Sequence, residues 1–154
     1  MTQLKAGDKA PDFTALNQNG SEIKLSDYKG KKLILYFYPK DDTPTCTTEA
    51  CNFRDNYTSL KKAGYEVVGV SINDEKAHQK FIDKYELPFN LIADPDKEVI
   101  EQYGVWGMKK FMGREFMGTH RITFVIDEDG TIEDIIKKVK SKVATQQILN
   151  SVKT

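Results

Sequence analysis

The sequence has few of the features that would place a protein in a membrane or outside the cell. Its 154 residues include two cysteines, one tryptophan and two histidines. The longest apolar run, residues 33–38, is far shorter than the ~20 residues that span a bilayer. The amino-terminal stretch MTQLKAGDKAPDF lacks the apolar segment of a secretion signal. We therefore expect a soluble, cytoplasmic protein.

An excess of charge is also missing, because 23 basic residues balance 23 acidic ones. Such a chain exerts no general attraction on nucleic acid or anionic lipid, so we expect neither as a partner. Hydrophobic residues make up 39% and charged residues 30%, which is typical of a globular protein. At ~150 residues per domain, the length predicts one domain over residues 1–154.

Strand and helix patterns alternate along the chain and predict an α/β fold. Asn19-Gly20 joins two short alternating segments into an amino-terminal β-hairpin. Further strands are expected at residues 32–38, 65–72, 90–93, 121–127 and 131–136. Helices are expected at residues 47–62, 74–86 and 96–103, and after Ser141, where the last would carry Val143, Ile148, Leu149 and Val152. Residues 104–118, with four glycines and three methionines, are expected to form a long loop.

The segment PKDDTPTCTTEACNFRD, residues 39–55, combines the features of a reactive site. It follows the carboxyl end of the expected central strand, where open α/β sheets bind ligands. Cys46 falls near the start of the next helix, where free N–H groups and the helix dipole favour a thiolate. Two cysteines this close indicate redox or metal chemistry, although two buried small side chains would give the same spacing.

Several segments resemble one protein family. Pro39, Thr43 and Cys46 match the peroxiredoxin pattern P-x-x-x-T-x-x-C, and TPTCTTEACNFRD resembles the signature of the bacterioferritin-comigratory-protein, or Q-type, branch. GREFMGTHRITFVIDEDGTI resembles that branch's segment around its active-site arginine, and GDKAPDF resembles the family's start. Thr45 departs from the pattern, since most members have glycine there. The resemblance implies a thioredoxin-like fold: a mixed central sheet flanked by helices, with an amino-terminal β-hairpin extension.

The resemblance also implies a role for each matching residue. Cys46 would be the peroxidatic thiolate, which a peroxide oxidises to a sulfenic acid. Cys51 would be the resolving thiol, which forms an intramolecular disulfide with Cys46. Thr43 would hydrogen-bond the thiolate and the peroxide, Arg121 would stabilise the developing charge, and Pro39 would shield the pocket.

Substrates and partners follow from the same resemblance. It implies a peroxidase for hydrogen peroxide and organic hydroperoxides, recycled by thioredoxin or a similar dithiol, in antioxidant defence. We expect no cofactor and no metal, and a monomer, because the disulfide forms within one chain. Glu49 also matches a family position and is expected to play a supporting role.

Helix geometry places a condition on that disulfide. Five residues of α-helix give ~7.5 Å of rise and ~140° of rotation. The Cα atoms of Cys46 and Cys51 would then lie ~8–9 Å apart, beyond the ~7 Å reach of a disulfide. If both cysteines are helical when reduced, part of the helix must unwind before they can bond.

The basic residues leave a second activation mechanism open. A histidine could activate the cysteine. However, His78 is expected to be solvated on a polar helix, and His120 would point to the opposite face from Arg121. Arg54 has no carboxylate one helical turn away and could instead reach the site.

Two other protein classes also remain open. Met108, Met112 and Met117 could bind copper(I) beside the two thiols, or they could cover an apolar patch. Zinc is a weaker alternative, because the chain has too few suitably spaced ligands. A thioredoxin-like thiol–disulfide oxidoreductase would share the fold, but it would carry C-x-x-C where this chain has C-x4-C.

Overall fold

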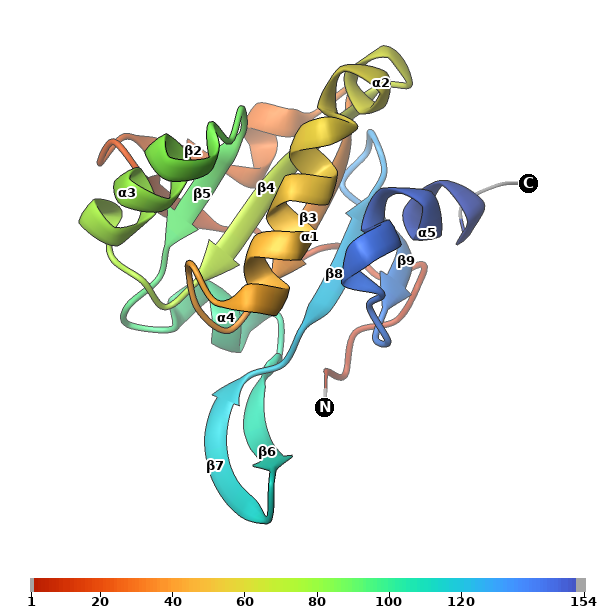
Figure 1. The fold of residues 1–154 in the computed structure, drawn as a ribbon. Helices are drawn as coiled ribbons and strands as arrows, with labels where there is room; N and C mark the ends of the chain where they lie inside the picture. The colour runs from red at the N-terminus through yellow and green to blue at the C-terminus, as the bar shows by residue number, and fades with distance from the viewer. Residues whose placement is uncertain (1, 152–154) are drawn as a thin grey trace.

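A computed structural model describes residues 2–151, which are built on a seven-stranded mixed sheet and a separate two-stranded hairpin (Figure 1). The strands are β1 (Thr14–Asn17), β2 (Glu22–Lys24), β3 (Lys32–Phe37), β4 (Tyr65–Ser71), β5 (Asn90–Ala93), β6 (Trp106–Phe111), β7 (Arg114–Thr119), β8 (Ile122–Ile126) and β9 (Ile132–Ile136). The large sheet has the order β2-β1-β5-β4-β3-β8-β9. Within it β3, β4 and β5 run parallel, and the other neighbours pair antiparallel.

Helices cover both faces of this sheet. They are α1 (Pro44–Asp55), α2 (Tyr57–Lys62), α3 (Glu75–Tyr85), α4 (Glu98–Gln102) and α5 (Ala144–Ser151), with 3₁₀ turns η1 (Leu25–Tyr28) and η2 (Ser141–Val143). Helices α1, α3 and α5 lie across one face in Figure 1, while α4 contributes to the core on the other. The expected α/β class, the mixed sheet flanked by helices and the amino-terminal β1–β2 hairpin are confirmed.

Strand β3 lies inside the sheet, between β4 and β8, and its side chains are apolar on both faces. Successive residues of a strand point to opposite faces, so one continuous apolar run fills two cores. The core on the α4 side receives Leu33, Leu35 and Phe37. The core under α1, α3 and α5 receives Ile34, Tyr36 and Tyr38. The carboxyl end of β3 is thereby fixed from both sides.

The helix expected at residues 47–62 differs from the prediction at both its start and its middle. It begins at Pro44, where the fixed φ of proline suits the first helical position. It is also divided in two at Asn56, whose side-chain amide donates to the carbonyl of Asn52 at 2.8 Å. That bond competes with the backbone ladder, which is a common reason for a helix to end at asparagine.

The prediction of a long loop at residues 104–118 is wrong, because this segment forms the β6–β7 hairpin. Met108 pairs with Met117, and Lys109 pairs with Phe116. Most of its side chains are exposed, so the segment has no buried face to produce a clear alternating pattern. The hairpin projects from the end of the molecule at which α1 begins (Figure 1).

The carboxyl-terminal helix also starts later than expected. Ser141 opens the 3₁₀ turn η2 and α5 begins at Ala144, so Ser141 does not cap the α-helix. Val143 is exposed, and Val152, expected on the same helix, lies outside the described residues. Among residues 2–151, no helix has the length and apolar character required to cross a membrane.

Candidate active site

The segment between β3 and α1 positions Cys46 at the start of a helix. Thr43 is the residue before the first helical position, with an extended backbone (φ −94°, ψ 155°). Its hydroxyl donates to the carbonyl of Lys40 at 2.9 Å, and its own carbonyl accepts from Thr47 N–H at 2.8 Å. Cys46 therefore lies in the first turn of α1, where N–H groups lack intrahelical partners and the dipole favours an anion.

The Cys46 sulfur has a direct cationic partner. Cys46 is 2% exposed, and the Nη2 of Arg121 donates to its Sγ at 3.0 Å. Arg121 immediately precedes β8, and the antiparallel register places the next residue, Ile122, opposite Phe37 at the end of β3. Strand pairing thus brings the guanidinium to the cysteine from 75 residues away.

Glu49 binds the other side of the same guanidinium. It lies one turn after Cys46 on α1, is fully buried, and its Oε1 accepts from Arg121 Nη1 at 2.6 Å. Its second oxygen, Oε2, has no hydrogen-bond partner among the described residues. One planar guanidinium therefore spans a thiol and a carboxyl group.

Burial and charge act in opposite directions on this pair. Burial raises the pKa of Glu49 to about 7, although the charge and hydrogen bond of Arg121 act to lower it. For Arg121, burial disfavours the charged form, but attraction to Glu49 and Cys46 outweighs it and raises its pKa. The guanidinium therefore remains charged, while Glu49 is close to its titration point at neutral pH.

Cys51 occupies a different surface of the same helix. It is half-buried and unpaired, and it lines a shallow depression with Thr47, Thr48, Asn52, Asp55 and Lys142. Cys46, in contrast, faces Arg121 and the buried core. Both cysteines lie within α1, so the geometric condition of the sequence analysis is met. The helix must open before these two sulfurs can bond.

The two remaining expected site residues lie on the approach to α1. Pro39 lies two residues after the end of β3 and is half-buried, and Thr43 is half-buried at the entrance to the helix. The hydroxyl proton of Thr43 is directed to the Lys40 carbonyl and not to sulfur. Thr45 is exposed at the second position of α1. Direct contacts thus link Cys46, Arg121 and Glu49, while Pro39 and Thr43 belong to the adjoining segment.

Arg54, which could reach the site, makes its hydrogen bonds elsewhere. Its guanidinium donates to Asp55 at 2.9 Å and to the Tyr85 carbonyl at 2.8 Å, and Cys51 is close enough to interact with its charge.

The expectation that His78 is solvated is wrong. It is completely buried, bound to Asp41 at 2.7 Å and to the Ile92 carbonyl at 2.8 Å. His120 binds the Met108 carbonyl of the hairpin at 3.0 Å. Neither histidine is hydrogen-bonded to a cysteine in the described part of the chain.

Lys109 is a neighbour of the site that the sequence did not indicate. It lies on β6, donates to the Thr119 carbonyl at 3.1 Å, and lines a cavity that also includes His120 and Arg121. Burial and the Arg121 charge lower its pKa, with an opposing effect from Cys46. The sequence predicted a loop at this segment, and a residue on a loop has no defined orientation. The orientation of Lys109 follows only from the β6–β7 hairpin.

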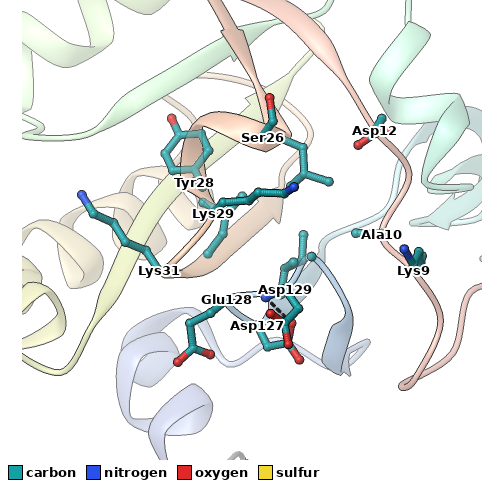
Figure 2. Close-up of a pocket in the computed structure, with 14 residues that line it drawn as sticks. Lys9, Ala10, Asp12, Ser26, Tyr28, Lys29, Lys31, Asp127, Glu128 and Asp129 are labelled. Atoms are coloured by element: carbon teal, nitrogen blue, oxygen red, sulfur yellow. Dashed lines mark hydrogen bonds between the residues drawn. The ribbon is translucent and has the colours of Figure 1, made fainter.

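A second cavity, of about 300 Å³, lies at the other end of the sheet (Figure 2). Its lining includes Lys29 and Lys31 on one side and residues 127–130, from the β8–β9 turn, on the other. It contains no cysteine and no arginine. Among residues 2–151, no group of three or more His, Cys, Asp or Glu side chains could hold a metal ion. The site at Cys46 is therefore the strongest candidate for chemistry.

Replacing Glu49 by glutamine should change how stability depends on pH. The folded protein keeps a proton on Glu49 that the unfolded chain releases, since the pKa is raised from 4.5 to about 7. The stability from this group is complete below pH 4.5 and is lost as pH rises through about 7. Wild type should lose up to about 3 kcal/mol relative to Glu49→Gln across this window, measured by denaturant melts. A pH-independent difference would contradict the assignment.

Comparison with known proteins identifies the family. Residues 6–135 match the model of the AhpC/TSA family. The chain is 49% identical to a putative peroxiredoxin bcp of Haemophilus influenzae over 97% of both chains. It is 45% identical to peroxiredoxin Bcp of Escherichia coli over 99% of this chain and 98% of that one. A solved bacterioferritin comigratory protein of Xanthomonas campestris, described by its alkyl peroxide reduction activity, superposes with a TM-score of 0.87 at 30% identity over 96% of each chain. The protein belongs to the AhpC/TSA family as a peroxiredoxin with a thioredoxin fold, a thiol-dependent peroxidase.

Proposed function

We propose that Cys46 is the peroxidatic residue of this peroxidase. The observation that carries the proposal is the 3.0 Å contact from Arg121 to a buried cysteine sulfur in the first turn of a helix. A thiolate there attacks the nearer peroxide oxygen, the O–O bond breaks, and the departing alkoxide or hydroxide takes up a proton. Cys46 becomes a sulfenic acid, and the product is an alcohol or water.

The neighbouring side chains have distinct roles in this proposal. Arg121 stabilises the thiolate and the charge that develops on the departing oxygen. Glu49 holds the guanidinium plane in place through its 2.6 Å bond. Thr43 would turn its hydroxyl to the bound peroxide, and Pro39 would limit access of water to the pocket.

Cys51 is proposed as the resolving thiol. Its sulfur attacks the Cys46 sulfur, water leaves, and an intramolecular disulfide forms. A dithiol then reduces that disulfide and is itself oxidised. Peroxiredoxins act on peroxides together with thioredoxin-like reductants, and we propose thioredoxin or a similar dithiol for this chain.

The same proposal covers substrates and setting. We propose hydrogen peroxide and organic hydroperoxides as substrates, which the alkyl peroxide activity of the Xanthomonas protein supports. A cycle that needs a dithiol favours the reducing cytoplasm. Because both cysteines lie in one helix of one chain, a monomer is sufficient, with residues 1–154 as one domain. The balanced charge supports neither nucleic acid nor membrane as a partner.

Substitution of the two cysteines tests the assignment. Cys46→Ser should abolish peroxide consumption in a thioredoxin-coupled assay, because the attacking sulfur is lost. Cys51→Ser should still be oxidised once by peroxide, and mass spectrometry should find a sulfenic acid at Cys46. If Cys46→Ser keeps full turnover, or if Cys51 is the first residue oxidised, the assignment is overturned.

Arg121→Lys should lower the rate of Cys46 oxidation by about 10²-fold, since lysine keeps the charge but loses the planar pair of donors that spans sulfur and carboxylate. Stopped-flow measurement of the oxidation step would show this. Arg114→Lys is the matched control, because Arg114 is exposed on β7 and should be nearly silent. Equal effects of the two substitutions would remove Arg121 from the mechanism.

Oxidation should cost the protein local order. The disulfide requires α1 to open at residues 46–51, which breaks backbone hydrogen bonds and exposes side chains such as Phe53. Amide exchange across this segment should be faster in the oxidised than in the reduced protein, while β3 stays protected. Such a short loop gives little entropic stabilisation, so the oxidised form should melt at the same temperature or lower. An oxidised protein with an intact, equally protected helix would refute the opening.

A further inference from the structure

The structure contains a buried histidine, His78, that the proposed reaction does not use. His78 lies on α3 with no exposed surface, and its two ring nitrogens have separate partners. Nε2 is 2.8 Å from the carbonyl oxygen of Ile92, and Nδ1 is 2.7 Å from Oδ2 of Asp41. Asp41 belongs to the segment between β3 and α1, so this contact joins α3 to the entrance of the active site.

The hydrogen-bond partners of His78 limit where its protons can lie. A carbonyl oxygen only accepts, so Nε2 must carry a hydrogen for the bond to Ile92. The 2.7 Å contact to Asp41 then needs a second proton between Nδ1 and the carboxyl group. A neutral imidazole facing an ionised carboxylate would leave two acceptors in contact. The pair is therefore either an imidazolium with a carboxylate or a neutral histidine with a carboxylic acid.

The second oxygen of Asp41 is also hydrogen-bonded. Oδ1 accepts from the hydroxyl of Tyr38 at 2.6 Å, so both carboxyl oxygens have a buried partner. Burial and the negative charge of Asp41 raise the pKa of Tyr38 well above its usual value, which keeps its proton available as a donor. Both distances fall in the range of charge-assisted hydrogen bonds to a carboxylate.

The pair restrains the segment that leads to Cys46. The backbone N–H of Asp41 also donates to Asn73 at 2.9 Å, so this residue is bound through both its side chain and its main chain. Thr43 follows two residues later as the entrance to α1. A shift at Asp41 would therefore displace Thr43 relative to the Cys46 sulfur.

We propose that His78 is a positioning residue for the peroxide reaction: through its buried hydrogen bond to Asp41, it anchors the segment that presents Thr43 to Cys46. This inference rests on the proposed role of Cys46. His78 touches neither sulfur nor peroxide and acts only through the segment. Misplacement of a reacting group by about 1 Å is sufficient to slow a reaction by about 10²-fold.

Two measurements on reduced protein separate positioning from general stability. One is the single-turnover rate of Cys46 with hydrogen peroxide, which depends on Thr43. The other is alkylation of Cys46 by iodoacetamide, which needs the thiolate but no hydroxyl from Thr43. His78→Leu should slow the peroxide reaction about ten-fold or more, with alkylation within about two-fold of wild type.

A surface contact of the same helix supplies the matched control. Lys84 on α3 binds Asp42 at 2.8 Å, beside Asp41, but both side chains are exposed. Exposed ion pairs contribute about 0–1 kcal/mol, so Lys84→Gln should leave both rates unchanged. In Asp41→Asn the amide oxygen can accept from Tyr38 while the amide nitrogen donates to Nδ1 of a neutral His78. This variant should therefore retain the peroxide rate to within about three-fold, whereas Asp41→Ala should lose it as His78→Leu does.

The Asp41 pair of variants gives the same comparison if His78→Leu does not fold. Equal losses of peroxide reaction and alkylation would overturn the proposal, as would an unchanged peroxide rate in His78→Leu or an Asp41→Asn no better than Asp41→Ala. Nitrogen NMR of the wild-type protein is an independent test. The His78 ring should carry a proton on Nε2, as the bond to the Ile92 carbonyl requires, and a bare Nε2 would contradict the anchored geometry. Failure of wild-type Cys46 to react with peroxide would instead overturn the proposed function.

Discussion

One guanidinium group joins the parts of this protein on which its chemistry depends. Arg121 donates to the Cys46 sulfur with one nitrogen and to the Glu49 carboxyl group with another, and both acceptors are buried on α1. Burying a thiolate and a carboxylate without a partner would cost several kcal/mol. The cation makes both tolerable and fixes their relative orientation. The first turn of α1 is thereby held to the start of β8, the antiparallel neighbour of β3.

The sheet makes that contact possible because it places the end of β3 beside the start of β8. The chain leaves β3 toward α1 at the edge of the sheet where the antiparallel neighbour β8 starts, with Phe37 opposite Ile122. Helix α3 closes the site from the other side, because His78 is bound to Asp41 between β3 and α1. Three segments distant in sequence therefore meet at one short loop. Apolar packing on both faces of β3 keeps this edge rigid.

Local patterns predicted the elements better than the contacts between them. The NG turn and the apolar run of β3 were sufficient for the architecture, and the motif around Cys46 pointed to the residue that is proposed to react. The Arg121–Glu49 bond joins residues 72 positions apart, so only the resemblance pointed to both residues. The β6–β7 hairpin was missed because its strands bury neither face fully, which leaves no alternating pattern to read.

The burial of His78 could have been predicted, since it stands three residues before Phe81 and seven before Tyr85, on the same face of α3. Its imidazole is polar, but its position on the apolar face of α3 decides its burial. The early start of α1 was likewise present in the sequence, because Thr43-Pro44 is a common helix opening. The division at Asn56 was less accessible, since it depends on which backbone group the side-chain amide selects.

The shared guanidinium has a consequence for the order of events in the proposed cycle. While Cys46 is a thiolate, Arg121 is attracted to a negative sulfur as well as to the Glu49 carboxyl group, and it binds both. A sulfenic acid carries no charge, so the attraction between Arg121 and the first turn of α1 weakens as soon as the peroxide is consumed. The chemical step itself thus releases the restraint that would keep the two sulfurs apart. In the proposed cycle, the loss of one electric charge would therefore time the opening of the helix, and an unreacted protein would keep its site closed.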